Sequence, residues 1–279
     1  MPDIAFVNGR FLPWQDATVS IDDRGFQFGD AVYEVIRTYR GSPFELGAHL
    51  DRLDRSAAQL SIPQPYTRKQ WTQWIHQGLS LAGYPDAKIY IQVTRGVAPR
   101  EHNFPVESRP TVVMTIRAIH AIGPETRRTG VTACTREDLR WGRCDIKSVN
   151  LLANVLAREE ARKASVFETI LVRDGCVMEG AVSNVMAVQG DVIVTAPESP
   201  RILSGVTRTV VLKLAGREEL VVEERFMSVD SLYQADEVFL TGTTIEILGV
   251  VLIDGKLIGS GRPGPVTQAL AARWALLTG

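Results

Sequence analysis

The stretch Arg140-Trp-Gly-Arg-Cys-Asp-Ile-Lys-Ser-Val-Asn-Leu-Leu152 contains Lys147, one of six lysines in the chain. A lysine in a mostly apolar setting is usually a surface residue that extends its amine into water. Two later segments change this interpretation. Glu179 opens the segment Glu179-Gly-Ala-Val-Ser-Asn184, and Gly205-Val-Thr-Arg208 begins a stretch that we expect to be helical.

An amine, a carboxylate and a glycine-led helix start are the three groups that bind pyridoxal phosphate. The amine forms a Schiff base with the cofactor, and the carboxylate keeps the pyridine nitrogen protonated so that the ring accepts electrons. Backbone N–H groups at a helix start bind a phosphate. The combination therefore predicts pyridoxal 5'-phosphate as the cofactor, with Lys147 and Glu179 as the catalytic residues.

These segments resemble the fold-type IV pyridoxal-phosphate enzymes, and the similarity is closest to the D-amino-acid transaminases. It runs the length of the chain. The segments that carry it, besides those above, are Asp23-Arg-Gly-Phe-Gln-Phe-Gly-Asp-Ala-Val-Tyr-Glu34, His49-Leu-Asp-Arg-Leu53, Gln92-Val-Thr-Arg-Gly96 and Arg100-Glu-His102 with Asn103-Phe-Pro105. The resemblance implies that Lys147 forms the internal aldimine.

The resemblance also implies a set of cofactor-binding residues. A hydroxyl, a guanidinium and helix-terminal N–H groups suit a phosphate dianion. From the residues alone Arg52 fits a salt-bridged helix face equally well, because it lies in Asp51-Arg-Leu-Asp-Arg55. The implied set is Arg52, Lys147, Glu179, Ser183, Asn184, Val206, Thr207 and Thr243.

Arg100 and His102 are candidates for binding a substrate carboxylate. In an extended backbone, residues two apart point to the same side, so both side chains would face one carboxylate while Glu101 points away. Without the resemblance, a mobile basic loop is an equal alternative. The resemblance adds further substrate-binding residues, namely Tyr33, Val35, Arg37 and Thr244.

Together these features predict transamination of D-amino acids, with a 2-oxo acid such as 2-oxoglutarate or pyruvate as the acceptor. The nearest alternative is a branched-chain L-amino-acid aminotransferase of the same fold. That family usually has a tyrosine five residues after the lysine, where this chain has Leu152. An (R)-amine transaminase, an enzyme similar to aminodeoxychorismate lyase and a non-catalytic cofactor carrier are further alternatives.

Composition excludes several other classes of protein. The 279 residues include 45% hydrophobic residues and carry a net charge of −1, which favours neither nucleic acid nor a membrane surface as a partner. Three cysteines without short spacing indicate a reduced, cytoplasmic compartment. The four histidines show no metal-ligand spacing. No apolar run is long enough to span a membrane.

Hydrophobic periodicity predicts two α+β domains, each a sheet or barrel-like core with flanking helices. We expect an N-terminal domain over residues 1–119, a linker at 120–124, where Gly123-Pro124 interrupts the pattern, and a C-terminal domain over 125–279 that carries the lysine. The fold-type IV resemblance also implies a homodimer. Helices are expected at 49–60, 67–81, 151–163, 206–215 and 265–277.

Strands are expected between these helices. Asn8-Gly9 is a hairpin signal between two short apolar runs, and Asp174-Gly175 is another. The expected strands are 4–7, 10–12, 16–21, 31–39, 88–94, 111–118, 131–135, 168–172, 177–178, 185–188, 192–195, 238–241 and 245–253.

Overall fold

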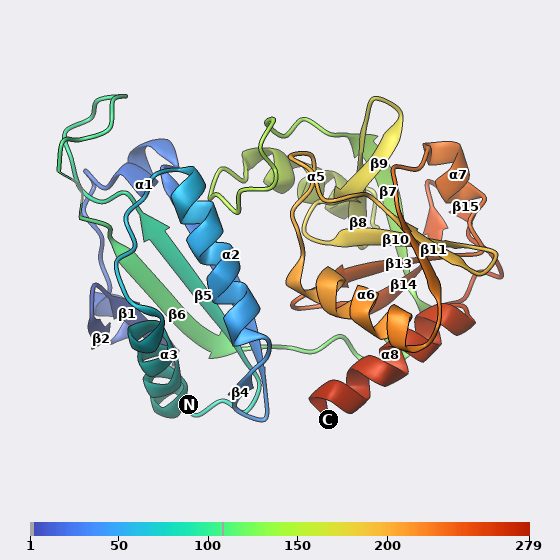
Figure 1. Ribbon diagram of the computed structural model, residues 1–279, viewed down its shortest axis with the longest axis horizontal. Helices are drawn as coiled ribbons and strands as arrows, with labels where there is room; N and C mark the ends of the chain where they lie inside the picture. The colour runs from blue at the N-terminus through green and yellow to red at the C-terminus, as the bar shows by residue number, and fades with distance from the viewer. Residues whose placement is uncertain (1–2, 108) are drawn as a thin grey trace. The chain divides into compact units, whose positions relative to one another are not determined.

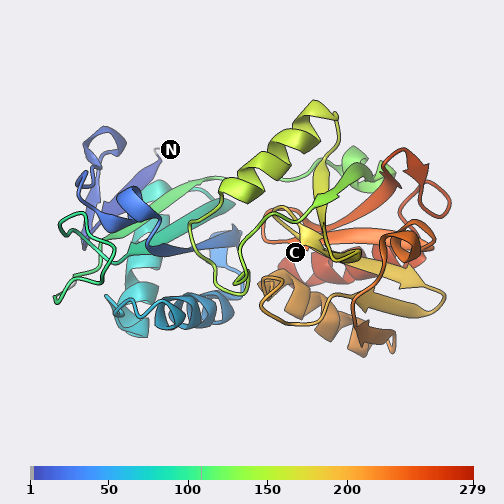
Figure 2. The same cartoon turned by 90° about the horizontal axis from the view of Figure 1, so that it is seen from above.

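The computed structural model describes residues 3–107 and 109–279. The chain divides into two compact units (Figures 1 and 2). Unit 1 contains the described residues up to His120 together with Ile146–Asn150, and unit 2 contains Ala121–Asp145 and Leu151–Gly279. No helix in the two described ranges is both long enough and apolar enough to cross a membrane.

Unit 1 is built on a six-stranded antiparallel sheet among its described residues, in the order β2-β1-β6-β5-β3-β4. Helices α2 (Leu46–Gln59) and α3 (Arg68–Ala82) bury their apolar sides against this sheet. The strands are β1 (Ile4–Val7), β2 (Arg10–Leu12), β3 (Ala31–Tyr39), β4 (Ser42–Pro43), β5 (Ala87–Thr94) and β6 (Val112–Ala118).

Local sequence signals explain the ends of several of these elements. Asn8 and Gly9 both have positive φ, as a two-residue hairpin between β1 and β2 requires. The Thr67 hydroxyl accepts a hydrogen bond from the Gln70 N–H, and the Gln70 side chain accepts one from the Thr67 N–H, which forms a capping box at the start of α3. The sequence therefore specifies where this helix begins.

The expected strand at 16–21 was wrong. A short 3₁₀ helix, η1 (Trp14–Asp16), begins this region, and no strand follows before the five-residue helix α1 (Arg24–Phe28). The Ser20 hydroxyl accepts a hydrogen bond from the Asp22 N–H, and the Asp23 carboxylate accepts one from the Gly25 N–H. These side-chain bonds form a turn and a helix cap directly after the expected strand.

Unit 2 contains a mixed sheet of nine strands in the described range, ordered β12-β11-β10-β13-β14-β7-β8-β9, with β15 paired to β14. Only the pairs β11–β12, β14–β7 and β7–β8 are parallel. The strands are β7 (Val131–Glu137), β8 (Glu168–Arg173), β9 (Cys176–Gly180), β10 (Asn184–Gln189), β11 (Val192–Thr195), β12 (Val221–Glu224), β13 (Glu237–Gly242), β14 (Glu246–Ile253) and β15 (Lys256–Leu257).

Helices surround this sheet, and its apolar core lies within unit 2. The Glu237 carboxylate accepts hydrogen bonds from the N–H groups of Val266 and Thr267, which caps the start of the last helix. The helices of unit 2 are α4 (Pro124–Thr129), α5 (Leu152–Lys163), α6 (Val206–Arg217), α7 (Val229–Tyr233) and α8 (Pro265–Thr278).

The division of the chain differs from the expected domain limits at the linker and at the lysine segment. The first boundary falls between His120 and Ala121, and α4 begins at Pro124, the last residue of the expected linker. The lysine segment, however, belongs to unit 1 rather than to the C-terminal domain. The reason is that its backbone forms hydrogen bonds with β3, which periodicity within the segment cannot reveal.

Candidate active site

The Ile146–Asn150 segment holds Lys147 against β3 of unit 1. The Tyr33 N–H donates to the Lys147 carbonyl at 2.9 Å, and the Val149 N–H donates to the Ala31 carbonyl at 3.1 Å. The Lys147 N–H donates to the Ser56 hydroxyl on α2 at 3.1 Å. The Lys147 Nζ lies 4.2 Å from the centre of the Tyr33 ring. The lysine is thus fixed at its backbone, and its amine lies beside Tyr33.

Tyr33, Val35 and Arg37 lie on one face of β3, since residues two apart in a strand point to the same side. Tyr33 and Val35 are half-buried, whereas Arg37 is buried. Gln92 and Tyr90 of β5 pair with Tyr33 and Val35, respectively. The Tyr90 hydroxyl hydrogen-bonds to the Gln92 side chain at 2.7 Å, and burial raises the pKa of Tyr90 to about 12. This face therefore combines predicted substrate residues with two polar residues of β5 that sequence reasoning missed.

Arg52 of helix α2 lies against the other face of β3, where it meets Glu34. Its Nε and Nη2 donate to the two oxygens of Glu34 at 2.6 and 2.9 Å, and the His49 Nδ1 lies 2.8 Å from Glu34. Burial raises the pKa of Glu34, but Arg52 and His49 outweigh this effect and hold it well below its ordinary value. Burial lowers the pKa of His49. The ion pair joins α2 to β3. From the residues alone, a salt bridge along one helix face was the alternative for Arg52, and this pair is of a different kind. The phosphate role of Arg52 stays a prediction.

Arg100 and His102 lie in an exposed loop after β5. The Arg100 Cζ is 4.8 Å from the centre of the Phe28 ring, and the His102 ring centre is 5.5 Å from it. Both side chains therefore turn toward the same aromatic ring, as their alternation predicts. Tyr33, the third expected member of the group, contacts Lys147 and Tyr90 instead.

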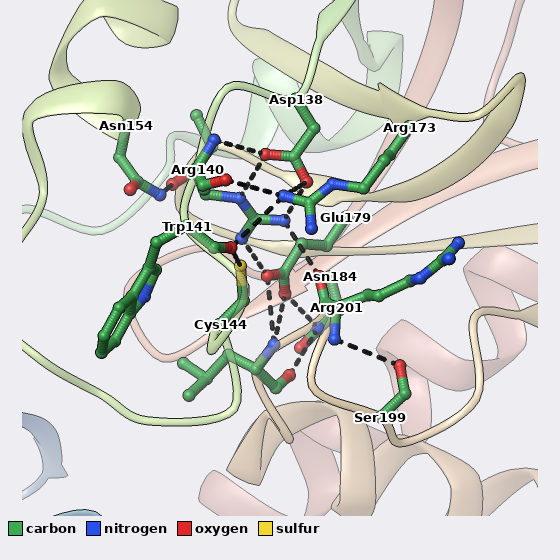
Figure 3. Close-up of polar contacts among 12 residues, drawn as sticks. Asp138, Arg140, Trp141, Cys144, Asn154, Arg173, Glu179, Asn184, Ser199 and Arg201 are labelled. Atoms are coloured by element: carbon green, nitrogen blue, oxygen red, sulfur yellow. Dashed lines mark hydrogen bonds and ion pairs between the residues drawn. The ribbon is translucent and has the colours of Figure 1, made fainter. Parts of the chain in front are cut away.

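Glu179 lies near the end of β9 in unit 2, and its carboxylate is buried among hydrogen-bond donors (Figure 3). Arg140 and Asn184 both donate to it, the latter at 2.9 Å. The Leu203 N–H lies 3.0 and 3.1 Å from its two oxygens. Burial raises the pKa of Glu179, and the charge of Arg140 opposes that rise. A carboxylate held in this way is well placed to pair with a cationic ring nitrogen.

Arg140 lies between two carboxylates in Figure 3. Its Nε donates to one oxygen of Asp138 at 2.9 Å and its Nη2 to the other at 3.0 Å, while its Nη1 donates to Glu179. Arg173 also donates to Asp138 at 3.0 Å. Sequence reasoning gave Arg140 no role beyond its place in the lysine run, and it did not name Asp138. The sequence did offer one signal, since Arg140 stands at the start of the lysine run. That position indicates that Arg140 belongs to the motif, but it does not indicate which carboxylate Arg140 binds.

Ser183 and Asn184 follow Glu179 through a tight turn. The Gly180 N–H donates to the Ser183 carbonyl at 2.7 Å, and a Cβ on Gly180 would lie 2.2 Å from the Ser183 Oγ. The Ser183 hydroxyl donates to Glu168 at 2.9 Å, whereas Asn184 donates to Glu179 and to the Leu203 carbonyl. The close packing explains why glycine follows Glu179.

The expected phosphate-binding residues of unit 2 lie near Asn184. Gly205 is the N-cap of α6, and no side chain caps the helix. A Cβ on Gly205 would lie 2.0 Å from the Asn184 Oδ1, so the helix start packs directly on that side chain. Asn184 pairs with Thr241 across β10 and β13, and Thr243 and Thr244 lie in the turn after β13. Val206 and Thr207 form the first turn of α6.

The structure brings some of the predicted residues together, in one group in each unit, and it places Arg100 and His102 beside Phe28, apart from both groups. Lys147 and Tyr33 are in contact in unit 1, with Val35 and Arg37 on the same strand face as Tyr33. In unit 2 the chain of contacts runs from Glu179 through Asn184 to the start of α6. Arg52 pairs with Glu34, which alternates with Tyr33 and Val35 along β3, and its helix α2 also contacts the lysine segment through Ser56.

Comparison with known proteins defines the class of this protein. The model of the class IV aminotransferase family matches residues 31–253, so the chain belongs to the class IV aminotransferases. It is 44% identical to the D-alanine aminotransferase of Bacillus licheniformis over 261 residues, which cover 94% of this chain and 92% of that protein. It is 40% identical to the D-alanine aminotransferase of Listeria monocytogenes over 268 residues, with coverages of 95% and 92%. The resemblance predicted from the motifs is confirmed.

Solved structures of aminotransferases share the whole fold. The branched-chain amino acid aminotransferase of Escherichia coli gives a TM-score of 0.95 at 29% identity, covering 100% of this chain and 95% of that chain. A second branched-chain amino acid aminotransferase, from T.th. and with pyridoxamine 5'-phosphate, gives 0.93 at 29% identity, with coverages of 99% and 93%. The predicted fold-type IV α+β architecture is therefore confirmed, and the protein is an aminotransferase.

Proposed function

We propose that this aminotransferase transfers amino groups from D-amino acids to a 2-oxo acid such as 2-oxoglutarate or pyruvate, with pyridoxal 5'-phosphate as its cofactor. The observation that carries the proposal is the similarity to D-alanine aminotransferases over nearly the whole chain, at 44% identity. The pair Arg100 and His102, which turn toward one ring, supports it because a guanidinium and an imidazole can both donate hydrogen bonds to a substrate carboxylate.

The polar groups of unit 2 fit the proposed cofactor. The Thr241 Oγ1 is buried without a hydrogen-bond partner among the described residues, and the first turn of α6 has no side-chain cap. Helix-terminal N–H groups and nearby hydroxyls of Thr207 and Thr243 would bind the phosphate. Ser183 and Asn184 would hold the ring indirectly through their bonds to Glu168 and Glu179.

When bound, pyridoxal phosphate supplies an electron sink for the charge that develops at the substrate carbon. Glu179 would keep a positive charge on the ring nitrogen, and Arg140, Asn184 and Leu203 hold its carboxylate in one orientation. Lys147 would attach the cofactor covalently and, once free, move a proton from the substrate Cα.

The substrate would be held at its carboxylate by Arg100, His102 and Tyr33, while Val35, Arg37 and Thr244 would contact the rest of it. A charge-assisted hydrogen bond contributes roughly 1.5–3 kcal/mol. Because the Cα–H bond must face the Lys147 amine, the location of the bound carboxylate decides which enantiomer reacts. The same Arg52 guanidinium that pairs with Glu34 would contribute to phosphate binding.

The branched-chain L-amino-acid alternative has less support, although enzymes of that kind share the fold. Leu152, which stands where that family usually has a tyrosine, is the first residue of α5 and is 72% exposed. It offers no hydroxyl at this position. Sequence identity to the branched-chain enzyme of Escherichia coli is 29%, against 44% for the D-alanine enzyme of Bacillus licheniformis.

We also infer a homodimer. Monomeric proteins rarely expose large contiguous apolar patches, and larger ones mark interfaces. Near the Arg100–His102 loop, Phe26, Phe104 and Val106 are 74%, 61% and 105% exposed. In unit 2, α5 exposes Leu152, Val155 and Leu156. A second copy that covers these side chains is the simplest explanation, and in it the loop would serve the partner's cofactor.

A substrate panel tests the function directly. The purified protein, loaded with pyridoxal 5'-phosphate, is assayed for oxo-acid formation from D- and L-enantiomers of alanine, glutamate, aspartate and leucine. We expect activity with D-alanine or the acidic D-amino acids and little with L-leucine. A preference for L-leucine would assign the protein to the branched-chain group. Release of pyruvate and an aromatic amine from aminodeoxychorismate would indicate a lyase.

A further inference from the structure

The first half of the Asp23–Glu34 motif has no part in the function proposed above. It forms α1, which begins at a cap where the Asp23 carboxylate accepts the Gly25 N–H at 2.8 Å. Gly29, with φ of 66°, ends the helix. Figure 1 shows α1 close to the loop that follows β5, and this is the loop that contains Arg100 and His102.

Arg24 of α1 binds this loop at its backbone. The residue is buried, and its Nη1 donates to the Glu101 carbonyl at 2.6 Å. Its Nε donates to Asp30 at 2.9 Å, which fixes the direction of the guanidinium. Because Glu101 lies between Arg100 and His102, this single bond restrains the backbone next to both residues.

Arg95 binds the far end of the same loop. Its Nε and Nη2 donate to the two oxygens of Asp30 at 2.7 and 3.0 Å, and it also donates to the carbonyls of Leu60 and Ser61 at the end of α2. The Arg95 Cζ lies 3.6 Å from the centre of the Phe104 ring. Asp30 therefore joins the two arginines that hold the middle and the end of the loop.

Phe28 contacts the Arg100 and His102 side chains themselves. The Arg24 Cζ and the Arg100 Cζ each lie 4.8 Å from its ring centre, and the His102 ring centre lies 5.5 Å away. A cation over an aromatic face gains roughly 0.5–1 kcal/mol at an exposed site. Phe28 thus favours one arrangement of two side chains that would otherwise sample many rotamers.

We propose that Arg24, Phe28, Asp30 and Arg95, here called the Asp30 cluster, are positioning residues that fix Arg100 and His102 for the substrate carboxylate. This inference rests on the proposed function. The physical reason is that an exposed loop with a long arginine side chain loses conformational entropy when it binds a ligand, and pre-ordering removes part of that cost. The cluster accordingly acts on carboxylate binding rather than on the reacting atoms.

Four variants of the holoenzyme separate this role from a general structural one. Phe28→Leu keeps apolar bulk but removes the ring face, and Phe28→Tyr restores the ring. Asp30→Asn removes the charge that joins Arg24 to Arg95. The matched control is Trp14→Leu, which removes a cation–ring contact with Arg117 (3.9 Å) on an exposed part of the same unit.

The first readout compares D-alanine with an (R)-configured amine of similar size that has no carboxylate. We expect Phe28→Leu and Asp30→Asn to raise the KM for D-alanine roughly twofold to fivefold, with a smaller change in kcat. Phe28→Tyr and the Trp14 control should stay close to the wild type. Equal losses for both substrates, or an unchanged KM for D-alanine, would overturn the proposal.

The second readout does not depend on activity. Amide hydrogen exchange of residues 98–107 should become roughly twofold to fivefold faster in Phe28→Leu and Asp30→Asn, and should be unchanged in the Trp14 control. Unchanged exchange in both variants would refute the positioning role. If wild-type protein fails to use any D-amino acid, the proposed function fails, whereas the exchange measurement still decides whether the cluster orders the loop.

Discussion

At the scale of single residues, the two groups expected to act on the cofactor are held differently. The Lys147 amine lies beside the Tyr33 ring, and only its backbone is fixed by hydrogen bonds to β3 and Ser56. The Glu179 carboxylate is held by Arg140, Asn184 and Leu203. This difference suits the roles expected of them, because the Lys147 amine would have to move during turnover whereas the Glu179 carboxylate would have to keep its position.

Lys147 should carry the cofactor covalently. Borohydride reduction of the protein loaded with pyridoxal 5'-phosphate, followed by digestion and mass spectrometry, should place the label on the peptide that contains Lys147. Lys147→Arg should remove the label while the fold is retained, because arginine does not attack the aldehyde. A label on any of the other five lysines would contradict the assignment.

Glu179→Gln should lower kcat on the order of 100-fold, since a charge that stabilises the developing negative charge is lost. Cofactor binding should persist, because the amide retains one acceptor oxygen. Titration with pyridoxal 5'-phosphate and steady-state kinetics measure both quantities. Glu125→Gln on α4 is the control, as this exposed carboxylate pairs only with Arg128 among the interactions described for it. Unchanged turnover would assign Glu179 a purely structural role.

Arg100→Ala should lower kcat/KM for D-alanine and D-glutamate about tenfold or more, because one charge-assisted hydrogen bond to the carboxylate is lost. An (R)-configured amine without a carboxylate should be affected much less. Arg128→Ala, in an exposed ion pair, serves as the control. Equal losses on both kinds of substrate would indicate that Arg100 stabilises the fold instead.

At the scale of elements, the buried pair between Glu34 of β3 and Arg52 of α2 makes stability depend on pH. The pKa of Glu34 is lowered in the folded protein, so its contribution is present above its ordinary pKa of 4.5 and is lost as the pH falls toward the folded value. Glu34→Gln removes this contribution and leaves a buried guanidinium without its counter-ion.

We expect Glu34→Gln to destabilise unit 1 by about 3–5 kcal/mol at neutral pH. The difference from the wild type should shrink as the pH falls below the ordinary value of 4.5. Urea denaturation at pH 7 and pH 4 measures both effects. Glu159→Gln, in an exposed pair with Arg162 on α5, should leave stability unchanged at either pH. If the loss of stability in Glu34→Gln did not depend on pH, the packing of the Glu34 side chain rather than its charge would be what stabilises unit 1.

Long, strongly patterned elements could be predicted from the sequence. Strand β3 was expected over its whole length, and α3 began one residue after its expected start because Thr67 is the cap rather than the first helical residue. Short elements could not be predicted in the same way. Helix α1 has only five residues, and its stability comes from the Asp23 cap and from contacts with a loop distant in sequence.

Motifs identified which residues belong to the site, but not their partners. Lys147, Glu179 and Arg100 could be named from resemblance, whereas Glu34 and Arg140 could not be given roles. Their partners lie 18 and 39 positions away in the chain, and such pairing depends on strand register and on the way a helix packs. Without the fold, the sequence contains no local signal for either ion pair.

At the scale of the whole molecule, exposed apolar side chains predict association. Sedimentation should show a dimer of the wild-type chain, and Leu156→Glu on α5 should shift it toward the monomer and lower activity, because a charge would be buried at the interface. Leu276→Glu on α8 is the control, since this residue is also exposed but lies on another helix. A fully active wild-type monomer would refute the dimer.

The placement of Ile146–Asn150 in unit 1 has a consequence for how the protein is made and how it evolves. During synthesis residues 3–120 of unit 1 leave the ribosome before the segment that hydrogen-bonds to Ala31 and Tyr33 has emerged. Unit 1 can complete its backbone pairing only after Asn150 has emerged, and by then part of unit 2 has already been made. The chain passes between the two units three times. A single recombination event therefore could not exchange either unit as a whole. The lysine expected to bear the chemistry lies in the segment that makes such an exchange impossible.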